Sequence, residues 1–157
     1  MPFIRGLWLH YLSDLNIIKP ISSSKNFTIE VLEQDKIIEL LNIKGFNEAV
    51  IYDANHPYQT ELVMVTRKGD EVVGVTGGCK PCSKLWQIGV DVLQGYQGLA
   101  LTAYIVNCLM LEILNRSYVP SYSTMVSNIA SQRVAYRVGY YAAWVSDWRC
   151  NFQALET

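Results

Sequence analysis

Alternating apolar and polar positions predict a series of strands after residue 26. Residues 27–31 alternate and include β-branched side chains, which favour a strand. The segments 62–66 and 72–76 flank a Lys68-Gly69-Asp70 turn and predict an antiparallel hairpin. Gly77-Gly78 to Lys84 is predicted as the next loop. Further strands are predicted at 85–93, 121–126 and 141–148.

Helical spacing of apolar residues predicts three helices between these strands. The first covers residues 34–42, and the second, of about four turns, follows Gly98. The third begins at Ser127 or Asn128, which can cap it, and ends at Gly139, a left-handed stop. Strands and helices in this order predict an α/β (α+β) fold in which a central mixed sheet has helices on both faces.

Residues 1–25 stand apart from this regular pattern. The first 20 residues are amphipathic, and Pro20 to Lys25 is rich in the residue types of connectors. The sequence therefore predicts an N-terminal arm and linker over 1–25 and a domain over 26–157. It leaves open whether the arm is a docking element or part of a larger upstream unit.

Length and charge exclude several classes of protein. The chain has 157 residues, of which 50% are hydrophobic and 17% are charged, so a single folded domain is expected rather than a disordered chain. The formal net charge of −1 excludes an extended basic face for nucleic acid. The pattern of a signal peptide or membrane span is not visible, so we expect a cytoplasmic protein without a membrane partner.

Four cysteines raise the question of metal or redox chemistry. Cys79-Lys-Pro-Cys82 forms a CxxC pair, which occurs in zinc sites and in redox motifs. A structural zinc site needs four ligands, and no second CxxC pair or nearby pair of histidines supplies them. We expect reduced thiols in a solvent-facing loop and no metal.

The most informative stretch runs from a buried strand through a glycine-containing turn into a helix. Backbone N–H groups without helical partners and the helix dipole make such a helix start attractive to anions. Gly98 and Ala100 leave room for a bulky anion to approach the backbone, and a pyrophosphate suits this geometry. The alternative is an ordinary turn whose glycines serve only the chain reversal.

Two segments resemble the signatures of the GNAT superfamily of N-acyltransferases. Val90-Asp-Val92 followed by Tyr96-Gln-Gly-Leu-Ala-Leu101 resembles the acyl-CoA-binding motif (Gln/Arg)-x-x-Gly-x-(Gly/Ala). Residues 127–140 resemble the second signature, in which an Asn and a Ser open a helix that ends in Gly-Phe or Gly-Tyr. The resemblance covers residues 27–149 and implies the GNAT fold, acetyl-CoA as cosubstrate and a primary amine as acceptor.

The resemblance also implies where acetyl-CoA lies, namely where two parallel strands, 86–93 and 122–126, splay apart. A backbone N–H near Val92 would polarise the thioester carbonyl, and Asn128, which can also serve as a helix cap, would bond the pantetheine arm. Arg133 would contact the 3′-phosphate or remain a solvated helix cation. The implied binding residues are Val90, Val92, Gln97, Gly98, Leu99, Ala100, Leu101, Thr102, Asn128, Ser131 and Arg133.

Catalytic roles are less direct, because a protonated amine does not attack a thioester and needs a base. Asp91 is the candidate base, although it can equally be a structural acceptor, and Glu61 or Asp53 could line the acceptor pocket. The tyrosine that the family places in the later helix aligns with Ala135. Tyr136 is therefore the candidate acid for the thiolate, 100° further around the helix.

Three functions remain open at this point. The first is transfer of acetyl from acetyl-CoA to an unidentified primary amine by direct attack in a ternary complex. The second is a non-catalytic module that binds or senses acyl-CoA, and the third is an interaction domain with a degenerate CoA cleft. A homodimer formed through a terminal strand is a further expectation.

Overall fold

The computed structural model describes residues 3–23, 26–43 and 45–151, and its strands form one seven-stranded sheet. The order across the sheet is β2-β3-β4-β5-β6-β1-β7. The β5–β6 pair is parallel and the other pairs are antiparallel, so the sheet is mixed as predicted. The strands are β1 (Phe3–Ser13), β2 (Thr28–Glu33), β3 (Thr60–Lys68), β4 (Glu71–Cys79), β5 (Leu85–Val92), β6 (Val119–Met125) and β7 (Tyr140–Asn151).

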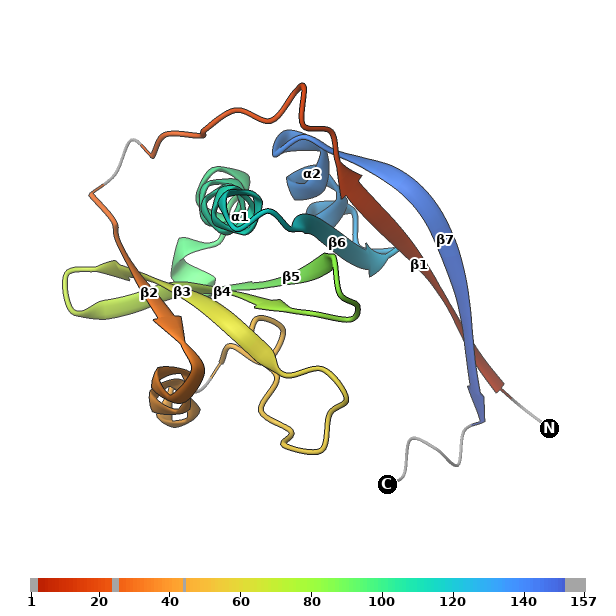
Figure 1. The fold of residues 1–157 in the computed structure, drawn as a ribbon, viewed down its shortest axis with the longest axis horizontal. Coiled ribbons are helices and arrows are strands. Elements are labelled where there is room, and N and C mark those ends of the chain that lie inside the picture. The colour runs from red at the N-terminus through yellow and green to blue at the C-terminus, as the bar shows by residue number, and fades with distance from the viewer. Residues whose placement is uncertain (1–2, 24–25, 44, 152–157) are drawn as a thin grey trace.

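Helices lie on both faces of the sheet, which confirms the predicted architecture (Figure 1). Helix α1 (Leu99–Asn115) and helix α2 (Ile129–Arg137) cover one face, which we call the helix face. The segment predicted as a helix over 34–42 is a 3-10 helix, η1 (Gln34–Asn42), and lies on the opposite face, which we call the second face. A short 3-10 turn, η2 (Gln94–Tyr96), joins β5 to α1.

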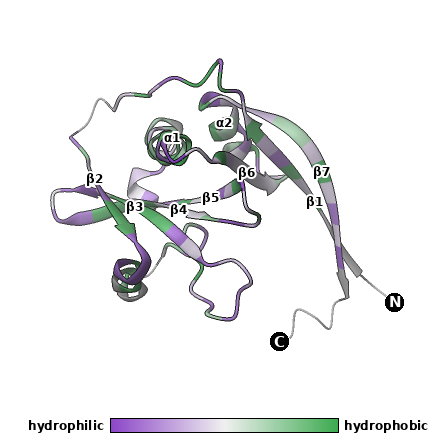
Figure 2. Cartoon of the chain, in the orientation of Figure 1, coloured by the Kyte–Doolittle hydropathy of each residue, from purple (hydrophilic) through white to green (hydrophobic). Residues whose placement is uncertain are grey.

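Each face has its own apolar core, and this explains why the sheet needs cover on both sides. On the helix face, α1 residues such as Val106 and Leu109 pack against Trp86 and Ile88 of β5. On the second face, η1 and the loop after it pack against strands β3 and β4. Figure 2 shows that the long loop before β3 is largely hydrophilic, unlike the strands beneath these cores.

Local signals fix the β3–β4 hairpin and α2 where the sequence predicted them. Gly69 has a φ of +60°, the left-handed conformation that the tight turn between β3 and β4 requires. Asn128 caps α2 by accepting a hydrogen bond from the backbone N–H of Ser131. Gly139 has a φ of +95° and ends the helix, as expected for a glycine stop.

The predicted loop after the hairpin is wrong at its start, because Gly77 and Gly78 continue β4. A Cβ at Gly77 would lie 1.8 Å from the carbonyl oxygen of Ala49, so glycine here permits a chain crossing rather than a turn. Pro120, which has no backbone N–H to donate, lies within β6. The pairing of β1 with β6 ends at Leu12 and Ser121, so the missing N–H of Pro120 costs no hydrogen bond to β1.

The N-terminal segment lies inside the sheet. The sequence pattern predicts an arm and linker over residues 1–25, whereas in the structure β1 pairs antiparallel with β6 on one side and with β7 on the other. Strand β1 therefore lies between β6 and β7, which follow each other in the chain through α2, and it is an internal strand of the sheet. Residues 15–23 then run over the helix face, where the side chain of Asn107 in α1 bonds the backbone of Ile21 and Lys19.

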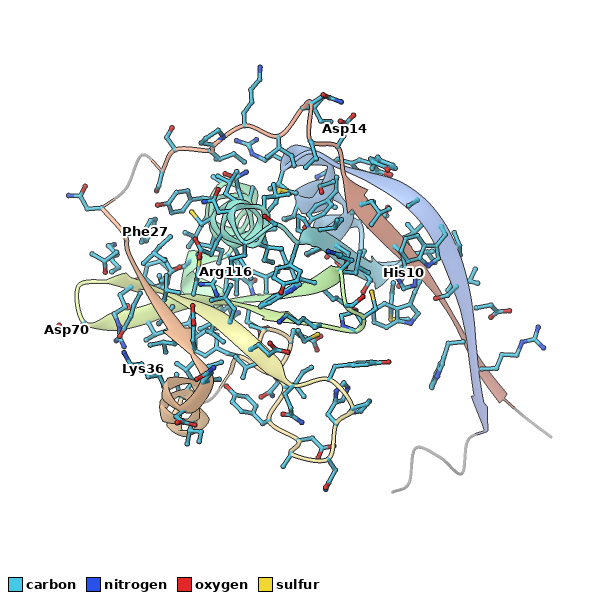
Figure 3. The ribbon with its side chains drawn as sticks, viewed as in Figure 1. His10, Asp14, Phe27, Lys36, Asp70 and Arg116 are labelled. Carbon is cyan, nitrogen blue, oxygen red and sulfur yellow. The ribbon has the colours of Figure 1, made fainter. Side chains whose placement is uncertain are left out.

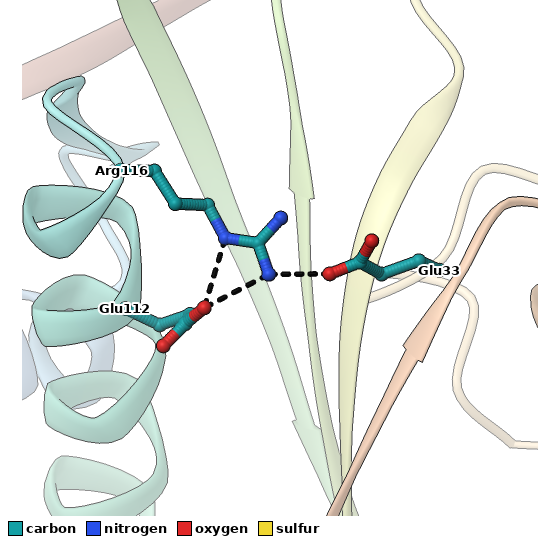
Figure 4. Close-up of polar contacts among 3 residues, drawn as sticks. All are labelled: Glu33, Glu112 and Arg116. Atoms are coloured by element: carbon teal, nitrogen blue, oxygen red, sulfur yellow. Dashed lines mark hydrogen bonds and ion pairs between the residues drawn. The ribbon is translucent and has the colours of Figure 1, made fainter.

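An ionic cluster connects the C-terminal end of α1 to β2, an edge strand of the sheet (Figure 4). The guanidinium of Arg116 donates to Glu112 of α1 and to Glu33 at the end of β2. These contacts raise the pKa of Arg116, the Glu33 contact being the largest cause.

Neither α-helix of the described residues combines the length and the apolar composition that a membrane-spanning helix needs.

Candidate active site at the β5–β6 opening

Strands β5 and β6 separate after their first residue pairs, and the resemblance had implied that these two parallel strands splay apart. Their parallel pairing runs from Leu85 and Val119 to Ile88 and Tyr122 and then ends. Strand β5 continues to Val92 in pairing with β4, while β6 continues to Met125 in pairing with β1. The two strands therefore leave an opening between their C-terminal halves.

Backbone donors of β5 are turned toward this opening. Leu93 N–H donates to Val73 of β4, whereas Lys84 C=O accepts from Val119 of β6. Because strand residues point their backbone groups alternately to the two sides, the even-numbered residues of β5 face β6. Val90 and Val92 therefore turn their N–H groups into the opening, beyond the last residue pair with β6.

The first turn of α1 presents further backbone donors. The helix begins after Gly98, and no side chain caps its N-terminus. The amides of Leu99, Ala100 and Leu101 belong to the first helical turn, which has no intrahelical acceptors. Both the amide and the hydroxyl of Thr102 donate to the carbonyl oxygen of Gly98, so Thr102 does not offer a free donor.

Gln97 and the turn before it connect β5 to α1. The side-chain amide of Gln97 donates to the carbonyl oxygen of Val92 at 3.4 Å, a long contact. Tyr96 donates its hydroxyl to Glu71 at 2.7 Å, which anchors the turn to the start of β4. The turn is thereby held without using the first-turn amides of α1.

Helix α2 borders the opening from the β6 side. The carbonyl group of the Asn128 side chain accepts from the Ser131 N–H at 3.1 Å, so its predicted capping role is confirmed. Ser131 is hydrogen-bonded through its hydroxyl to Tyr122, the last β6 residue paired with β5. Arg133 is exposed on the same helix.

Asp91 holds the loop that crosses the second face. Its Oδ2 accepts from the backbone N–H of Glu48 at 2.8 Å and of Ala49 at 2.7 Å. The same loop passes so close to β5 that a Cβ at Gly89 would lie 2.0 Å from the Glu48 carbonyl oxygen. Burial raises the pKa of Asp91, while these two N–H bonds oppose the rise. Asp91 therefore has the structural role that the sequence left open, as an acceptor for two backbone N–H groups.

Tyr136 lies on the exposed side of α2. It is 57% exposed, and its ring meets the Tyr11 ring edge-to-face at 5.6 Å between centroids. It follows Ser131 by five residues, roughly 7.5 Å along α2 in the direction that leads back to β7. Ala135, at the position of the family's tyrosine, is fully buried. The structure therefore places Ala135 in the core and leaves the Tyr136 ring beside Tyr11, the β1 residue paired with Tyr122.

A cavity on the second face adjoins the point where β5 and β6 separate. Its volume is about 170 Å³, and His10, Gln87, Ser123 and Trp144 are among its lining residues. Gln87 and Ser123 are hydrogen-bonded across the two strands at 2.8 Å. Sequence reasoning missed His10 as a site residue, because its place depends on the pairing of β1 with β6 and β7.

Cys79 and Cys82 do not form a disulfide. Cys79 ends β4 and is partly buried, and this burial raises the pKa of its thiol. Cys82 is exposed in the loop between β4 and β5. Among the described residues, His, Cys, Asp and Glu side chains do not gather into a group that could hold a metal ion.

Comparisons with known proteins give a fold and no closer relative. No family model matches the chain, and no curated protein matches it. A GCN5-related N-acetyltransferase-like protein from Streptococcus suis superposes with a TM-score of 0.66 at 18% identity, over 92% of this chain. A GNAT-family acetyltransferase from Colwellia psychrerythraea superposes with a TM-score of 0.66 at 11% identity, over 95% of this chain. A GCN5-related N-acetyltransferase from Kribbella flavida gives 0.65 at 13% identity, over 93%.

These likenesses show that the chain has the GNAT fold, which the two sequence signatures had implied. The chain spans 56–62% of the length of these three solved proteins. Within this fold, six residues separate the end of β5 at the β5–β6 opening from the first turn of α1.

Proposed function

We propose that this chain is an N-acetyltransferase that transfers acetyl from acetyl-CoA to a primary amine within a ternary complex. The observation that carries the proposal is the juxtaposition of two sets of backbone donors. Val90 and Val92 turn their N–H groups into the β5–β6 opening, and the uncapped first turn of α1 follows it after six residues. The GNAT fold of the chain supports the same assignment.

The residues present fit a nucleotide thioester. The N–H groups of the first turn of α1 and the helix dipole suit a pyrophosphate. Gly98 has open space around its Cβ position, so the chain leaves this helix start unobstructed. Bound acetyl-CoA would supply an activated acyl group, and the N–H groups of Val90 and Val92 would stabilise negative charge that develops on the carbonyl oxygen.

Two residues of α2 complete the proposed binding site. The Asn128 carbonyl oxygen is engaged in capping, but the NH₂ of the same side chain is a further donor that can reach the pantetheine arm. Arg133, exposed on α2, is the candidate contact for the 3′-phosphate. Ser131 supports the site by bonding Tyr122 rather than by offering a free hydroxyl.

The direct test combines ligand binding with turnover. We expect acetyl-CoA to raise the melting temperature, because a ligand that binds only the folded state stabilises it. We also expect free thiol to appear when acetyl-CoA is incubated with a reactive member of a panel containing glycine, phenethylamine and kanamycin. Absence of stabilisation at millimolar acetyl-CoA would favour an interaction domain with a degenerate cleft and contradict the proposal.

A second candidate function is a module that binds acyl-CoA without catalysis. The observation that favours it is Ala135, which is fully buried at the position where the resemblance implies a tyrosine. Stabilisation by acetyl-CoA together with thiol release at the uncatalysed rate for every amine would select this alternative.

A further inference from the structure

We propose that His10, on β1, accepts the proton of the acceptor amine from the cavity on the second face. This inference rests on the proposed acetyl transfer and assigns its base. His10 lines the cavity with Gln87, Ser121, Ser123 and Trp144, and it pairs in register with Ser123 of β6. Figure 3 labels His10 in the region where β6, β1 and β7 lie together. Ser123 is the first β6 residue beyond the last pair with β5, so His10 lies beside the start of the opening.

Two contacts from β7 hold the imidazole in place. Its Nε2 lies 2.8 Å from the hydroxyl oxygen of Ser146. The ring stacks on Trp144, with 4.8 Å between centroids and 5° between planes. When Nε2–H donates to Ser146, the other ring nitrogen keeps its lone pair and can accept a proton. Ser146 and Trp144 are therefore positioning residues.

The surroundings keep the ring neutral. Burial lowers the pKa of His10 below its ordinary value of 6.5, so the free base predominates at pH 7. The cavity lining contains no carboxylate and no lysine or arginine among the described residues. Of the lining, only Tyr122 also titrates, and its hydroxyl bonds Ser131.

Neighbouring strands present few other ionisable groups to this side of the sheet. The next ionisable side chain on the same face of β5 is Asp91, which the Glu48 and Ala49 amides engage. The β6 residue beyond Ser123 on this face is Met125. On β7, Asp147 and Arg149 alternate with Ser146 and therefore belong to the opposite face. His10 is thus the base that the cavity provides.

The proposed step balances as follows. The acceptor nitrogen forms a bond to the thioester carbonyl carbon, and the carbon–sulfur bond then breaks to give an amide and a thiolate. The acceptor reacts as its neutral amine, so its nitrogen loses one proton on forming the amide. That proton passes to the free ring nitrogen of His10 and then to solvent, and solvent protonates the thiolate. Rate requires neutral His10, so kcat/KM should fall as the pH drops through a His10 pKa below 6.5.

The experiment compares His10→Gln with His56→Gln, a matched control at the only other histidine of the chain. His56 lies in the loop before β3, where it contacts the backbone of Tyr58. With acetyl-CoA and the best amine of the panel, we expect His10→Gln to lower kcat/KM about 100-fold and to abolish the acidic limb of its pH profile. His56→Gln should retain both the rate and the limb.

A second variant separates chemistry from folding. His10→Ala leaves a space in the cavity, and added imidazole should restore part of the rate if the ring acts as a base. Melting curves and stabilisation by acetyl-CoA should stay close to wild type in both variants. An unchanged acidic limb in His10→Gln, or no rescue of a folded His10→Ala, would overturn the role of His10 while acetyl transfer stands. No thiol release by the wild type would overturn acetyl transfer, and the base assignment with it.

Discussion

The two α-helices begin in different ways, and the contrast separates a binding surface from a finished structural element. Helix α2 starts at Asn128, whose side chain accepts from the Ser131 N–H. Helix α1 starts after Gly98 with no side-chain cap, although it is the longer helix and forms the centre of the core on the helix face. At α2 a side chain satisfies one first-turn N–H, whereas at α1 no side chain caps the first turn.

A third set of backbone donors extends the comparison to the second face. The amides of Glu48 and Ala49 converge on one carboxylate oxygen of Asp91. Here the protein itself supplies the anion, the Asp91 carboxylate, that the backbone amides bind. Removing such a partner should cost stability, whereas adding a side-chain cap at the start of α1 should cost ligand affinity.

The largest effect is expected from Gly98→Asp. Its Cβ would meet no atom within 4 Å, and the backbone φ of 160° is an extended conformation open to any residue. The new carboxylate would cap α1 and raise stability by about 0.5–1 kcal/mol. It would also occupy the donors needed for the pyrophosphate and repel it, so we expect acetyl-CoA affinity to fall at least roughly 100-fold, or about 2.7 kcal/mol. Calorimetric titration and denaturant unfolding measure the two effects.

Gly95→Asp is the matched control for this prediction. Gly95 also has open space at its Cβ position but lies in η2, before the helix start. It adds the same charge without a cap, so it should weaken acetyl-CoA binding far less. Equal losses in both variants would show that net charge, and not the α1 amides, governs binding.

An intermediate effect is expected from Asp91→Ala. Loss of the carboxylate leaves two main-chain donors without a partner, one of them on the buried Ala49, and should cost roughly 2 kcal/mol of unfolding free energy. Asp91→Asn keeps a carbonyl oxygen at the same place and should recover most of that loss. If Asp91→Asn is stable but has lost all acetyl transfer, Asp91 serves as the base and the assignment of His10 is wrong.

The smallest effect is expected from Asn128→Ala. Removal of the cap should lower stability by about 1 kcal/mol, because one N–H of α2 loses its acceptor. Affinity for acetyl-CoA should fall less than in Gly98→Asp, since only a pantetheine contact is removed. A larger loss of affinity than in Gly98→Asp would reverse the comparison between the two helix starts. Denaturant unfolding and calorimetric titration of the same samples decide it.

Much of the fold was predictable because its signals are local. The β3–β4 hairpin depends on Gly69, and α2 depends on Asn128 and Gly139, all of which act on their immediate neighbours in sequence. The strand character of Gly77 was not predictable from its neighbours. It follows from the approach of Ala49, a contact between residues far apart in the chain. The insertion of β1 between β6 and β7 is likewise a long-range pairing without a local signal.

The candidate site divides along the same line. The turn into α1 was identified because a strand, a glycine and a helix start follow one another within a few residues. The sequence indicated that Asp91 could be a base or a structural acceptor but could not decide between the two. The backbone groups that it binds lie over 40 residues earlier in the chain. His10 had only the signal of a lone polar residue within an apolar stretch. Its contacts with Ser146 and Trp144 come from the far end of the chain.

The most direct test of the central claim is an amide NMR titration of the wild-type chain with acetyl-CoA. We predict large shifts at the amides of Leu99, Ala100 and Leu101, which have no helical acceptor. The amides of Thr102 and Ser131, which already donate within the protein, should shift much less. Saturable binding that leaves the first turn of α1 unperturbed, or shifts centred on Ser131, would contradict the claim that the uncapped main-chain donors of α1 hold the nucleotide.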